Sequence, residues 1–435
     1  MNSSRTLAGW LHFQQQLHPA SIELELTRVR AVAERLALLP VTVPVAIVGG
    51  TNGKGSTATH LACLLKATGR RTGLFTSPHL RRYNERIRID NVPVSDDELL
   101  AAFDEIEAVR RDVSLTYFEF NTLAALLLFR MRAVQAMVLE VGLGGRLDAT
   151  NIVDADVAVV CSVSFDHTDW LGHTLEGIGR EKAGIFRAGR PVVLGEATMP
   201  DSVFEAARSL RCPLSVAQRR YRWQAPTGSL WDYADESGSL HGLPAPTLGG
   251  DIQFRNAATA IAALRLLLPT EPAARDVAVI AAGLSDVQLE GRLQRVGREP
   301  PWLLDVAHNP AAAAVLAATL RSQPVPGRTI AVFGMLADKD VAAVVAALHD
   351  VVDHWCLCDV DDPRGLSGAQ LRARMGAAAG DSEECGSVEA ACTRAAGQAS
   401  ATDRIAVCGS FHVVGPALDY LQAIIATWNN ESKSD

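Results

Sequence analysis

The feature that most constrains this chain is a short apolar strand that runs directly into a glycine-rich turn and then a helix. Residues 43–48, VPVAIV, predict a strand buried on both faces of a parallel sheet. The turn GGTNGKGS (49–56) follows, and a helical pattern extends from about residue 56 to residue 68. This order presents backbone N–H groups and the positive end of a helix to an anion. We therefore expect an α/β fold with a phosphate site at the carboxyl end of this strand.

The same alternation of strands and helices continues along the chain. A helix is predicted over residues 20–39, and further buried strands are predicted at 72–76, 136–141, 157–162 and 191–195. Short antiparallel strands are predicted within residues 213–250, followed by a helix at 254–268. A second α/β series then begins, with strands at 302–306, 329–334, 355–359 and 404–409. We expect two α/β domains, residues 1–292 and 293–435.

Composition excludes several classes of partner. The 435 residues hold 41 Lys and Arg against 49 Asp and Glu, a net charge of −8, which argues against a general nucleic-acid binder. The apolar run near the start is too short for a signal peptide, and the stretch 257–268 is too short to span a bilayer. The eight cysteines show neither a CxxC pair nor zinc-site spacing. We expect buried free thiols in a cytoplasmic protein that binds neither nucleic acid nor a membrane.

Lysine is scarce in this chain, which makes its positions informative. Five lysines stand against 36 arginines, and one of the five, Lys54, lies in the glycine-rich turn. It is placed to reach the outer phosphates of a nucleotide, and Ser56 or Thr57 offers a hydroxyl to phosphate or Mg²⁺. The strict GxxxxGK[ST] pattern fails, because Val48 and Gly55 stand where it requires glycine and a hydroxyl residue.

The string GTNGKGS resembles the nucleotide loop of the folylpolyglutamate synthase/dihydrofolate synthase family, relatives of the Mur peptidoglycan ligases. The resemblance continues in order over nearly the whole chain, through SPHL (77–80), TYFEF (116–120), LEVGLGGRLDATN (139–151), DHTDWLG (166–172), REKAGIF (180–186), RNAATA (255–260), DVAHNP (305–310), GMLADKD (334–340) and CGSFHVVG (408–415). It implies a P-loop-type, Mur-ligase-like ATPase domain followed by a smaller, Rossmann-like α/β domain.

The resemblance also implies a reaction. It is that of an ATP-dependent amide ligase that adds L-glutamate to dihydropteroate, giving dihydrofolate, and to reduced folates, giving folylpolyglutamates, through an acyl phosphate. Two alternatives stay open: a Mur-type ligase with a UDP-sugar substrate, and a P-loop NTPase that is not a ligase. We expect a monomer.

Site residues follow from the same resemblance. The expected ATP contacts are Thr51, Asn52, Gly53, Lys54, Gly55, Ser56, Asn256, Arg292 and Asp305. The expected Mg²⁺ ligands are Ser77, Glu140 and His167. Lys182 matches the lysine that this family and the Mur ligases carry as a carbamate, which would hold a second Mg²⁺; from spacing alone it is a helix-surface lysine.

Two further groups complete the expected site. The positions that match the family's dihydropteroate contacts are Ile22, Glu23, Leu24, Thr116, Tyr117, Phe118, Glu119, Leu147, Asp148 and Ala149. Without the resemblance, Tyr117 and Phe118 are as well explained by core packing. His308 and Ser410, at the ends of predicted strands in the second domain, are expected to line the glutamate or γ-phosphate side. Lys54, Lys182 and His308 are the expected catalytic residues.

Overall fold

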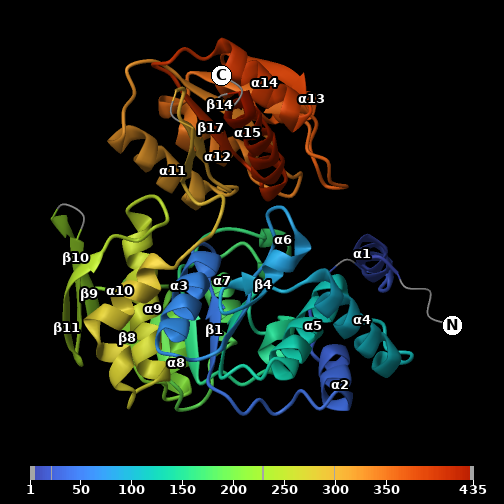
Figure 1. Cartoon of the computed structure of the whole chain (residues 1–435), viewed down its shortest axis with the longest axis vertical. Helices are drawn as coiled ribbons and strands as arrows, with labels where there is room; N and C mark the ends of the chain where they lie inside the picture. The colour runs from blue at the N-terminus through green and yellow to red at the C-terminus, as the bar shows by residue number, and fades with distance from the viewer. Residues whose placement is uncertain (1–4, 21, 228–229, 298, 432–435) are drawn as a thin grey trace. The chain divides into compact units, whose positions relative to one another are not determined.

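The computed structural model describes residues 5–20, 22–227, 230–297 and 299–431 (Figure 1). The chain divides into two compact units. The first comprises residues 1–164, 169–247 and 253–288, and the second comprises residues 165–168, 248–252 and 289–435. Each unit is built from sheets and helices, so the predicted α/β class is confirmed. Among the described residues, no helix is long and apolar enough to cross a bilayer.

The first unit is organised around one mixed sheet. Among the described residues its strands run in the order β4-β3-β2-β5-β1-β6-β7-β8. The strands are β1 (Val45–Gly49), β2 (Thr72–Phe75), β3 (Ile87–Ile89), β4 (Val92–Pro93), β5 (Ala136–Glu140), β6 (Val157–Val160), β7 (Val192–Leu194) and β8 (Leu214–Val216). All neighbours from β2 to β8 pair in parallel, and β3 and β4 extend the sheet antiparallel. Strand β1 therefore ends between β5 and β6, where open α/β sheets place their ligands.

Alternate residues of β1 enter two separate cores. Val45 and Ile47 pack into one core with helices α1, α2, α4, α5 and α8, and Ala46 and Val48 pack into the other with α3, α9 and α10. The helices of this unit are α1 (Leu7–Gln16), α2 (Thr27–Arg35), α3 (Lys54–Ala67), α4 (Asp96–Arg110), α5 (Tyr117–Met131), α7 (Leu175–Ala183), α8 (Asp201–Ser209), α9 (Ile252–Leu267) and α10 (Val277–Ser285). The short helix α6 (Thr168–Leu171) begins in the segment that belongs to the second unit.

A second, three-stranded sheet covers part of the α9 side. Strands β9 (Tyr221–Thr227), β10 (Leu230–Asp235) and β11 (Gly238–Pro244) pair antiparallel, as residues 213–250 predict. The start of that range differs from the prediction, because β8 instead joins the main sheet in parallel beside β7. Tyr221, Trp231 and Tyr233 bury their rings in the same core as α9.

The second unit holds a six-stranded sheet, within the described residues, in the order β12-β13-β17-β14-β15-β16. Its strands are β12 (Gln294–Val296), β13 (Trp302–Leu304), β14 (Thr329–Phe333), β15 (His354–Cys358), β16 (Ser382–Gly386) and β17 (Arg404–Cys408). Its helices are α11 (Pro310–Ser322), α12 (Val341–Leu348), α13 (Gly368–Met375), α14 (Val388–Gln398) and α15 (Phe411–Glu431). Strands β13 to β16 pair in parallel and β12 is antiparallel.

Candidate active site

The glycine-rich turn lies between β1 and α3 and is held by the segment that follows β6. The N–H of Thr51 donates to the Ser162 carbonyl (2.8 Å), and the N–H of Asn52 donates to the Ser162 hydroxyl (2.9 Å). Gly50 has φ of 140°, and a Cβ there would lie 3.1 Å from the backbone of Cys161. Gly55 and Ser56 lie in the first turn of α3, so the turn and the helix present N–H groups in one concavity.

Two lysines donate to one carbonyl of this turn. The Nζ of Lys54 donates to the carbonyl oxygens of Gly50 and Thr51 (3.1 Å each). The Nζ of Lys182, on α7, donates to the same Gly50 oxygen (3.0 Å). Lys182 is only 3% exposed, so the helix-surface interpretation of this lysine is wrong. Two ammonium groups at one carbonyl repel each other, and burial adds a desolvation cost to the charge on Lys182.

Asn256 lies close against the end of the turn. It is buried on α9, and its Nδ2 donates to Gln253 (2.9 Å). Gly53 has φ of 83°, and a Cβ there would lie 2.9 Å from Oδ1 of Asn256. The neighbouring Arg255 has a terminal nitrogen 3.7 Å from the same Cβ position and forms an ion pair with Glu196. A guanidinium therefore lies beside the glycine-rich turn.

Glu140 and Ser77 meet at the carboxyl ends of two adjacent strands. Glu140 is the last residue of β5 and is buried, and Ser77 lies just beyond β2. The backbone N–H of Ser77 donates to Oε2 of Glu140 (2.9 Å). Glu140 is also paired in register with Val48 on β1, directly before the glycine-rich turn. The buried Glu140 carboxylate thus lies at the strand ends beside the turn, next to Ser77, and carboxylate and hydroxyl oxygens suit Mg²⁺.

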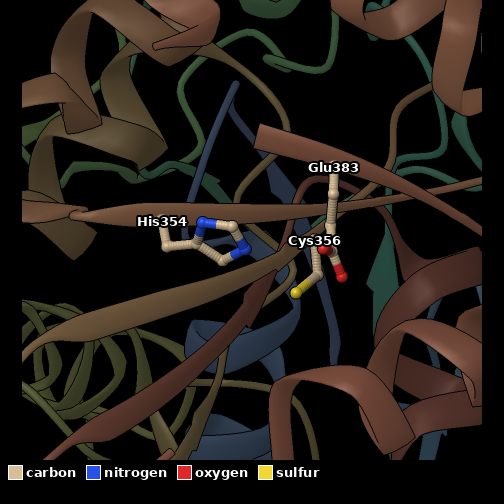
Figure 2. Close-up of side chains that lie close together, drawn as sticks. All are labelled: His354, Cys356 and Glu383. Carbon is tan, nitrogen blue, oxygen red and sulfur yellow. The ribbon is translucent and has the colours of Figure 1, made fainter. Parts of the chain in front are cut away.

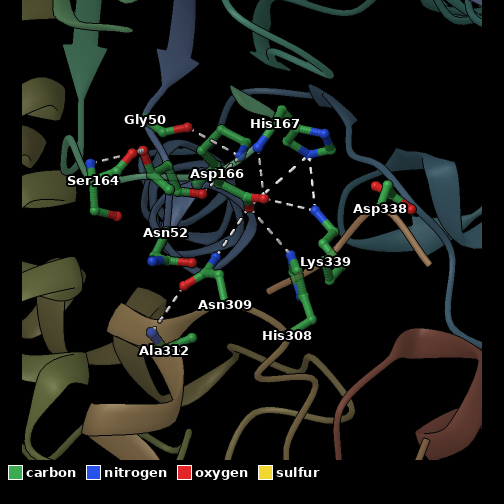
Figure 3. Close-up of polar contacts among 12 residues, drawn as sticks. Gly50, Asn52, Ser164, Asp166, His167, His308, Asn309, Ala312, Asp338 and Lys339 are labelled. Carbon is green, nitrogen blue, oxygen red and sulfur yellow. Dashed lines mark hydrogen bonds and ion pairs between the residues drawn. The ribbon is translucent and has the colours of Figure 1, made fainter. Parts of the chain in front are cut away.

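In the second unit, Asp166 gathers polar side chains from three loops (Figure 3). It accepts from the Nζ of Lys339 (2.7 Å) and from Nδ2 of Asn309 (3.0 Å), and its carboxylate lies 3.5 Å from Nε2 of His308. The predicted ligand His167 is next in the chain, with φ of 51° and its Nε2 3.4 Å from Lys339. Hydrogen bonding from His308 and the positive charge of Lys339 hold the pKa of Asp166 far below its usual range despite burial.

Arg292 and Asp305 also lie in the second unit, close to each other. Each carboxylate oxygen of Asp305 accepts one backbone N–H, from Leu293 (2.9 Å) and from Ala307 (2.8 Å). Burial raises the pKa of Asp305, and the charge of Arg292 opposes that rise. The Arg292 guanidinium lies 5.1 Å from the ring centre of Phe411. Asp305 therefore anchors the loop after β13. Each of its carboxylate oxygens can still accept one more hydrogen bond from another group.

His308 and Ser410 are brought near each other by the ends of β13 and β17. The N–H of Gly409 donates to the Ala307 carbonyl (2.9 Å), which places the two following residues on adjacent loops. The hydroxyl of Ser410 accepts the N–H of His412 (3.2 Å) in the first turn of α15, so this serine caps a helix. The His308 ring lies 6.0 Å from the Phe411 ring.

The residues expected to contact dihydropteroate fall into two groups, and Arg28 links the first. Glu23, between Ile22 and Leu24 in the segment before α2, pairs with Arg28 (3.2 Å). Arg28 also reaches the buried Glu119 (3.3 Å), which forms a capping box with Thr116 at the start of α5. Burial raises the pKa of Glu119, and Arg28 counteracts this.

The second group surrounds the loop after β5. Phe118 packs against Phe75 (5.7 Å between ring centres), and a Cβ at Gly142 would lie 2.6 Å from the Phe118 ring. Asp148, between Leu147 and Ala149, is buried and accepts the N–H groups of Gly142 (3.0 Å) and Leu143 (2.9 Å). The Tyr117 ring lies 5.4 Å from the Arg86 guanidinium. The core-packing explanation of Phe118 thus holds in part, since its ring contacts both Phe75 and the loop.

Four residues that contact the predicted site residues or the glycine-rich turn were not predicted from the sequence: Arg28, Asp166, Arg255 and Lys339. Arg255 and Asp166 each stand directly beside a predicted site residue in a quoted motif. Lys339 is one of only five lysines, so the scarcity that drew attention to Lys54 and Lys182 pointed to it as well. For Arg28, one arginine among 36, we find no signal in the sequence.

The chain matches two family profiles and is similar to a curated bacterial enzyme over nearly its whole length. Residues 48–194 match the family profile of the Mur ligase middle domain, and residues 291–411 match that of the Mur ligase glutamate ligase domain. The dihydrofolate synthase/folylpolyglutamate synthase of Escherichia coli is 44% identical over 420 residues, which is 96% of each chain.

Solved structures agree with that likeness. The structure of E. coli FolC in complex with DHPP and ADP superposes with a TM-score of 0.91 at 42% identity, covering 97% of this chain and 99% of that one. A bifunctional folylpolyglutamate synthase/dihydrofolate synthase with Mn, AMPPNP and L-glutamate bound gives a TM-score of 0.88 at 43% identity, with 97% and 99% covered.

Proposed function

This chain belongs to the dihydrofolate synthase/folylpolyglutamate synthase family of Mur ligases, and from that premise we propose that it is an ATP-dependent ligase that joins L-glutamate to dihydropteroate and to reduced folates. The observation that carries the proposal is the glycine-rich turn of β1 and α3, where Lys54 and Lys182 converge on the Gly50 carbonyl. Such a turn binds phosphate through N–H groups, and the lysines supply positive charge and a reactive amine.

The first step is phosphoryl transfer. One oxygen of the substrate carboxylate attacks the γ-phosphorus of ATP, the bond to the β–γ bridging oxygen breaks, and ADP leaves behind an acyl phosphate. This chemistry needs positioning and charge neutralisation from the protein. Within the first unit, residues 51–56 hold the phosphates, Lys54 neutralises the γ-phosphate and Asn256 fixes the turn. From the second unit, Arg292 would pair with phosphate and Asp305 with ribose hydroxyls.

The donors at the strand ends fit a hard divalent cation. Glu140 accepts the backbone N–H of Ser77, and the two residues would offer a carboxylate and a hydroxyl oxygen. His167 would offer an imidazole. We propose these three residues as Mg²⁺ ligands. Mg²⁺ bound there would neutralise charge on the transferring phosphoryl group. The solved relative with Mn and AMPPNP bound supports a divalent ion beside the nucleotide in this family.

A second cation requires an anion at Lys182. The amine is buried and shares the Gly50 oxygen with Lys54, so a second positive charge is costly there. The ammonium first loses a proton to give the neutral amine, which takes up CO₂ and releases a second proton to form a carbamate. A cation thus becomes an anion with two oxygen ligands. We include this carbamate and a second Mg²⁺ in the proposal.

The second step is aminolysis of the acyl phosphate. The neutral α-amine of glutamate attacks the acyl carbon, the bond to the phosphate oxygen breaks, and inorganic phosphate leaves as the amide forms. His308, held by Asp166 and by the Val306 carbonyl (2.8 Å), would orient glutamate or the γ-phosphate together with Ser410. The pterin acid would bind between the Glu23–Arg28–Glu119 group and Phe118.

The remaining parts of the proposal concern organisation. We propose that residues 1–292 form the ATP-binding domain and residues 293–435 the glutamate-ligase domain, and that the enzyme acts as a cytoplasmic monomer. Its eight cysteines are free thiols, which suits a reducing compartment. A UDP-sugar substrate finds no support among the relatives described above, which are folate enzymes.

One assay tests the function directly. Purified protein is given ATP, Mg²⁺ and glutamate, with dihydropteroate or tetrahydrofolate in separate reactions. We expect one amide and one ADP per turnover with each acid, and no sustained ATP turnover when either the acid or glutamate is omitted. Steady ATP hydrolysis that needs neither substrate would contradict a ligase and favour an NTPase of another kind.

A further inference from the structure

Strands β15 and β16, at one edge of the second sheet, bring three potentially metal-binding side chains together. The two strands pair in parallel, and Cys356 is in register with Glu383 (Figure 2). His354 and Cys356 are two residues apart on one strand, so their side chains share a face, and Glu383 joins them from the next strand. Helix α14 packs over both strands.

The donor atoms of these three side chains already lie close together. One imidazole nitrogen, the Cys356 sulfur and one Glu383 oxygen all lie within 4.8 Å of one another. A tetrahedral zinc ion holds such ligands about 3–4 Å apart. Small side-chain rotations would therefore close the cluster around an ion. Cys385 is a fourth candidate donor, because its sulfur lies 3.6 Å from the Glu383 carboxylate.

His354 is oriented as a metal ligand would be. Its Nδ1 lies 3.0 Å from a carboxylate oxygen of Asp381, and its side chain is only 8% exposed. Within the part of the chain that the structure describes, its buried Nε2 has no hydrogen-bond partner. An Nδ1–H donated to Asp381 leaves the Nε2 lone pair available, which is the carboxylate–histidine arrangement typical of metal centres. A buried ring nitrogen without a partner otherwise costs stability.

We propose that His354, Cys356 and Glu383 bind one Zn²⁺ ion, with Cys385 as the fourth ligand. Thiolate and imidazole together favour zinc over the Mg²⁺ of the ligase reaction, which prefers oxygen ligands. Arg394, which pairs with both oxygens of Glu383, orients that carboxylate from the second layer. Asp381 is largely exposed, which gives the ion a path from solvent.

The proposed site is structural and independent of the ligase activity. Strand β16 is the outermost strand of its sheet and pairs only with β15 among the described strands. Ligands from both strands would cross-link this edge to the sheet interior. The spacing of the cysteines gives no zinc signature because the donors come from two strands separated by α13.

Co²⁺ is the probe for the test, because it takes zinc sites and reports its ligands by absorption. The full chain is stripped of metal with a chelator and titrated with Co²⁺ in excess Mg²⁺. We expect one Co²⁺ per chain with tetrahedral ligand-field bands and a thiolate-to-cobalt charge-transfer band, and displacement of both by one equivalent of Zn²⁺. Zn²⁺ should also raise the thermal midpoint of the stripped protein.

Variants assign the ligands. His354→Ala and Cys356→Ser should lose the charge-transfer band and the thermal shift, and Glu383→Gln should weaken Co²⁺ binding about tenfold or more. Cys63→Ala is the control, since Cys63 is equally buried but lies on α3 of the first unit, outside the cluster; it should bind as the wild type does. Because Glu383 is only partly buried, Glu383→Gln should fold even if Cys356→Ser does not. It therefore tests metal binding independently of the Cys356 variant. Absence of the charge-transfer band in the wild type, or its survival in Cys356→Ser, overturns the proposal.

Discussion

The burial of Lys182 changes how this residue is interpreted. In the sequence it stands beside Glu181 on a helix, but in the structure its amine is buried and donates to Gly50. If it carries a carbamate, arginine cannot replace it, because a guanidinium stays protonated and does not take up CO₂. We expect Lys182→Arg and Lys182→Ala to lose activity equally, by about 100-fold or more, in steady-state ligation assays.

Rescue distinguishes a carbamate from a merely structural lysine. Short carboxylic acids should restore part of the activity of Lys182→Ala by supplying the missing anion, and should not restore Lys182→Arg, whose side chain fills the space. Lys66, on the exposed end of α3, provides the control, and Lys66→Arg should be fully active. Wild-type rates in Lys182→Arg would contradict the carbamate.

Glu140 and His167 give a second prediction at this scale. Glu140 accepts from Ser77, and its carboxylate is the proposed main ligand of the cation. Glu140→Gln keeps the hydrogen-bond acceptor but loses the charge, so the Mg²⁺ concentration for half-maximal ligation should rise at least about tenfold. His167→Ala should raise it as well. Titration of Mg²⁺ at saturating ATP and substrates measures both, and unchanged curves in the two variants would remove these residues from the cation site.

Side-chain environments of this kind were only partly accessible from the sequence. The motif around Lys54 could be identified because its residues are contiguous and the turn chemistry is local. The contact between Asp166 and Lys339 joins residues 173 positions apart, and no local pattern reports it. The link from Glu23 through Arg28 to Glu119 is equally non-local. Local signals therefore predicted the glycine-rich turn between β1 and α3, whereas tertiary packing determines what surrounds it.

At the scale of elements, α3 contains a buried histidine that should make the stability of the fold depend on pH. His60 is fully buried in this helix, and burial lowers its pKa from 6.5 to about 4 although a bond to the Ser56 carbonyl opposes the shift. Between about pH 6.5 and pH 4, His60 is therefore protonated in the unfolded chain but neutral in the folded chain. Stability should fall as the pH drops through this window, by up to about 3 kcal/mol from this residue.

Denaturant unfolding across this pH range provides the measurement. His60→Leu fills a similar buried volume without a titrating group, and the Ser56 carbonyl keeps its helical acceptor role. The loss of stability between pH 6.5 and pH 4 should be smaller in His60→Leu than in the wild type. An identical slope in both proteins would show that other groups control acid sensitivity.

Strongly periodic elements were the ones that sequence reasoning predicted well. Strands β1, β2, β5, β14 and β17 begin within two residues of their predicted positions, because continuous apolar runs bounded by turns mark buried parallel strands. Helix α1 was not predicted, since of its ten residues only Trp10 and Gln14 are buried. The predicted helix at 20–39 is limited to α2, and β16 was missed because its sequence, SEECG, is polar at a sheet edge.

At the scale of the whole molecule, two reactions depend on one nucleotide turn. The sequence has a single GTNGKGS string, so on the proposed mechanism dihydrofolate and polyglutamate synthesis would both form their acyl phosphates beside Lys54. A change confined to phosphoryl transfer therefore lowers both activities to the same fraction of the wild type. A change in the pterin-binding residues acts on the two acids separately, because dihydropteroate lacks the glutamate that a reduced folate carries.

Lys54→Ala and Phe118→Leu test this separation. Lys54→Ala should lower both activities by about 10³-fold or more, since it removes a charge that acts on the developing transition state. Circular dichroism and the thermal midpoint should be retained, because among the described residues the Lys54 amine donates to carbonyls of the turn itself. Phe118→Leu, which removes a ring packed over Gly142, should instead change the ratio of the two activities. The measurement is kcat/KM for each acid at saturating ATP and glutamate. If Lys54→Ala spared one activity, that reaction would have to form its acyl phosphate at another site. The proposal that both reactions use the same glycine-rich turn would then be wrong.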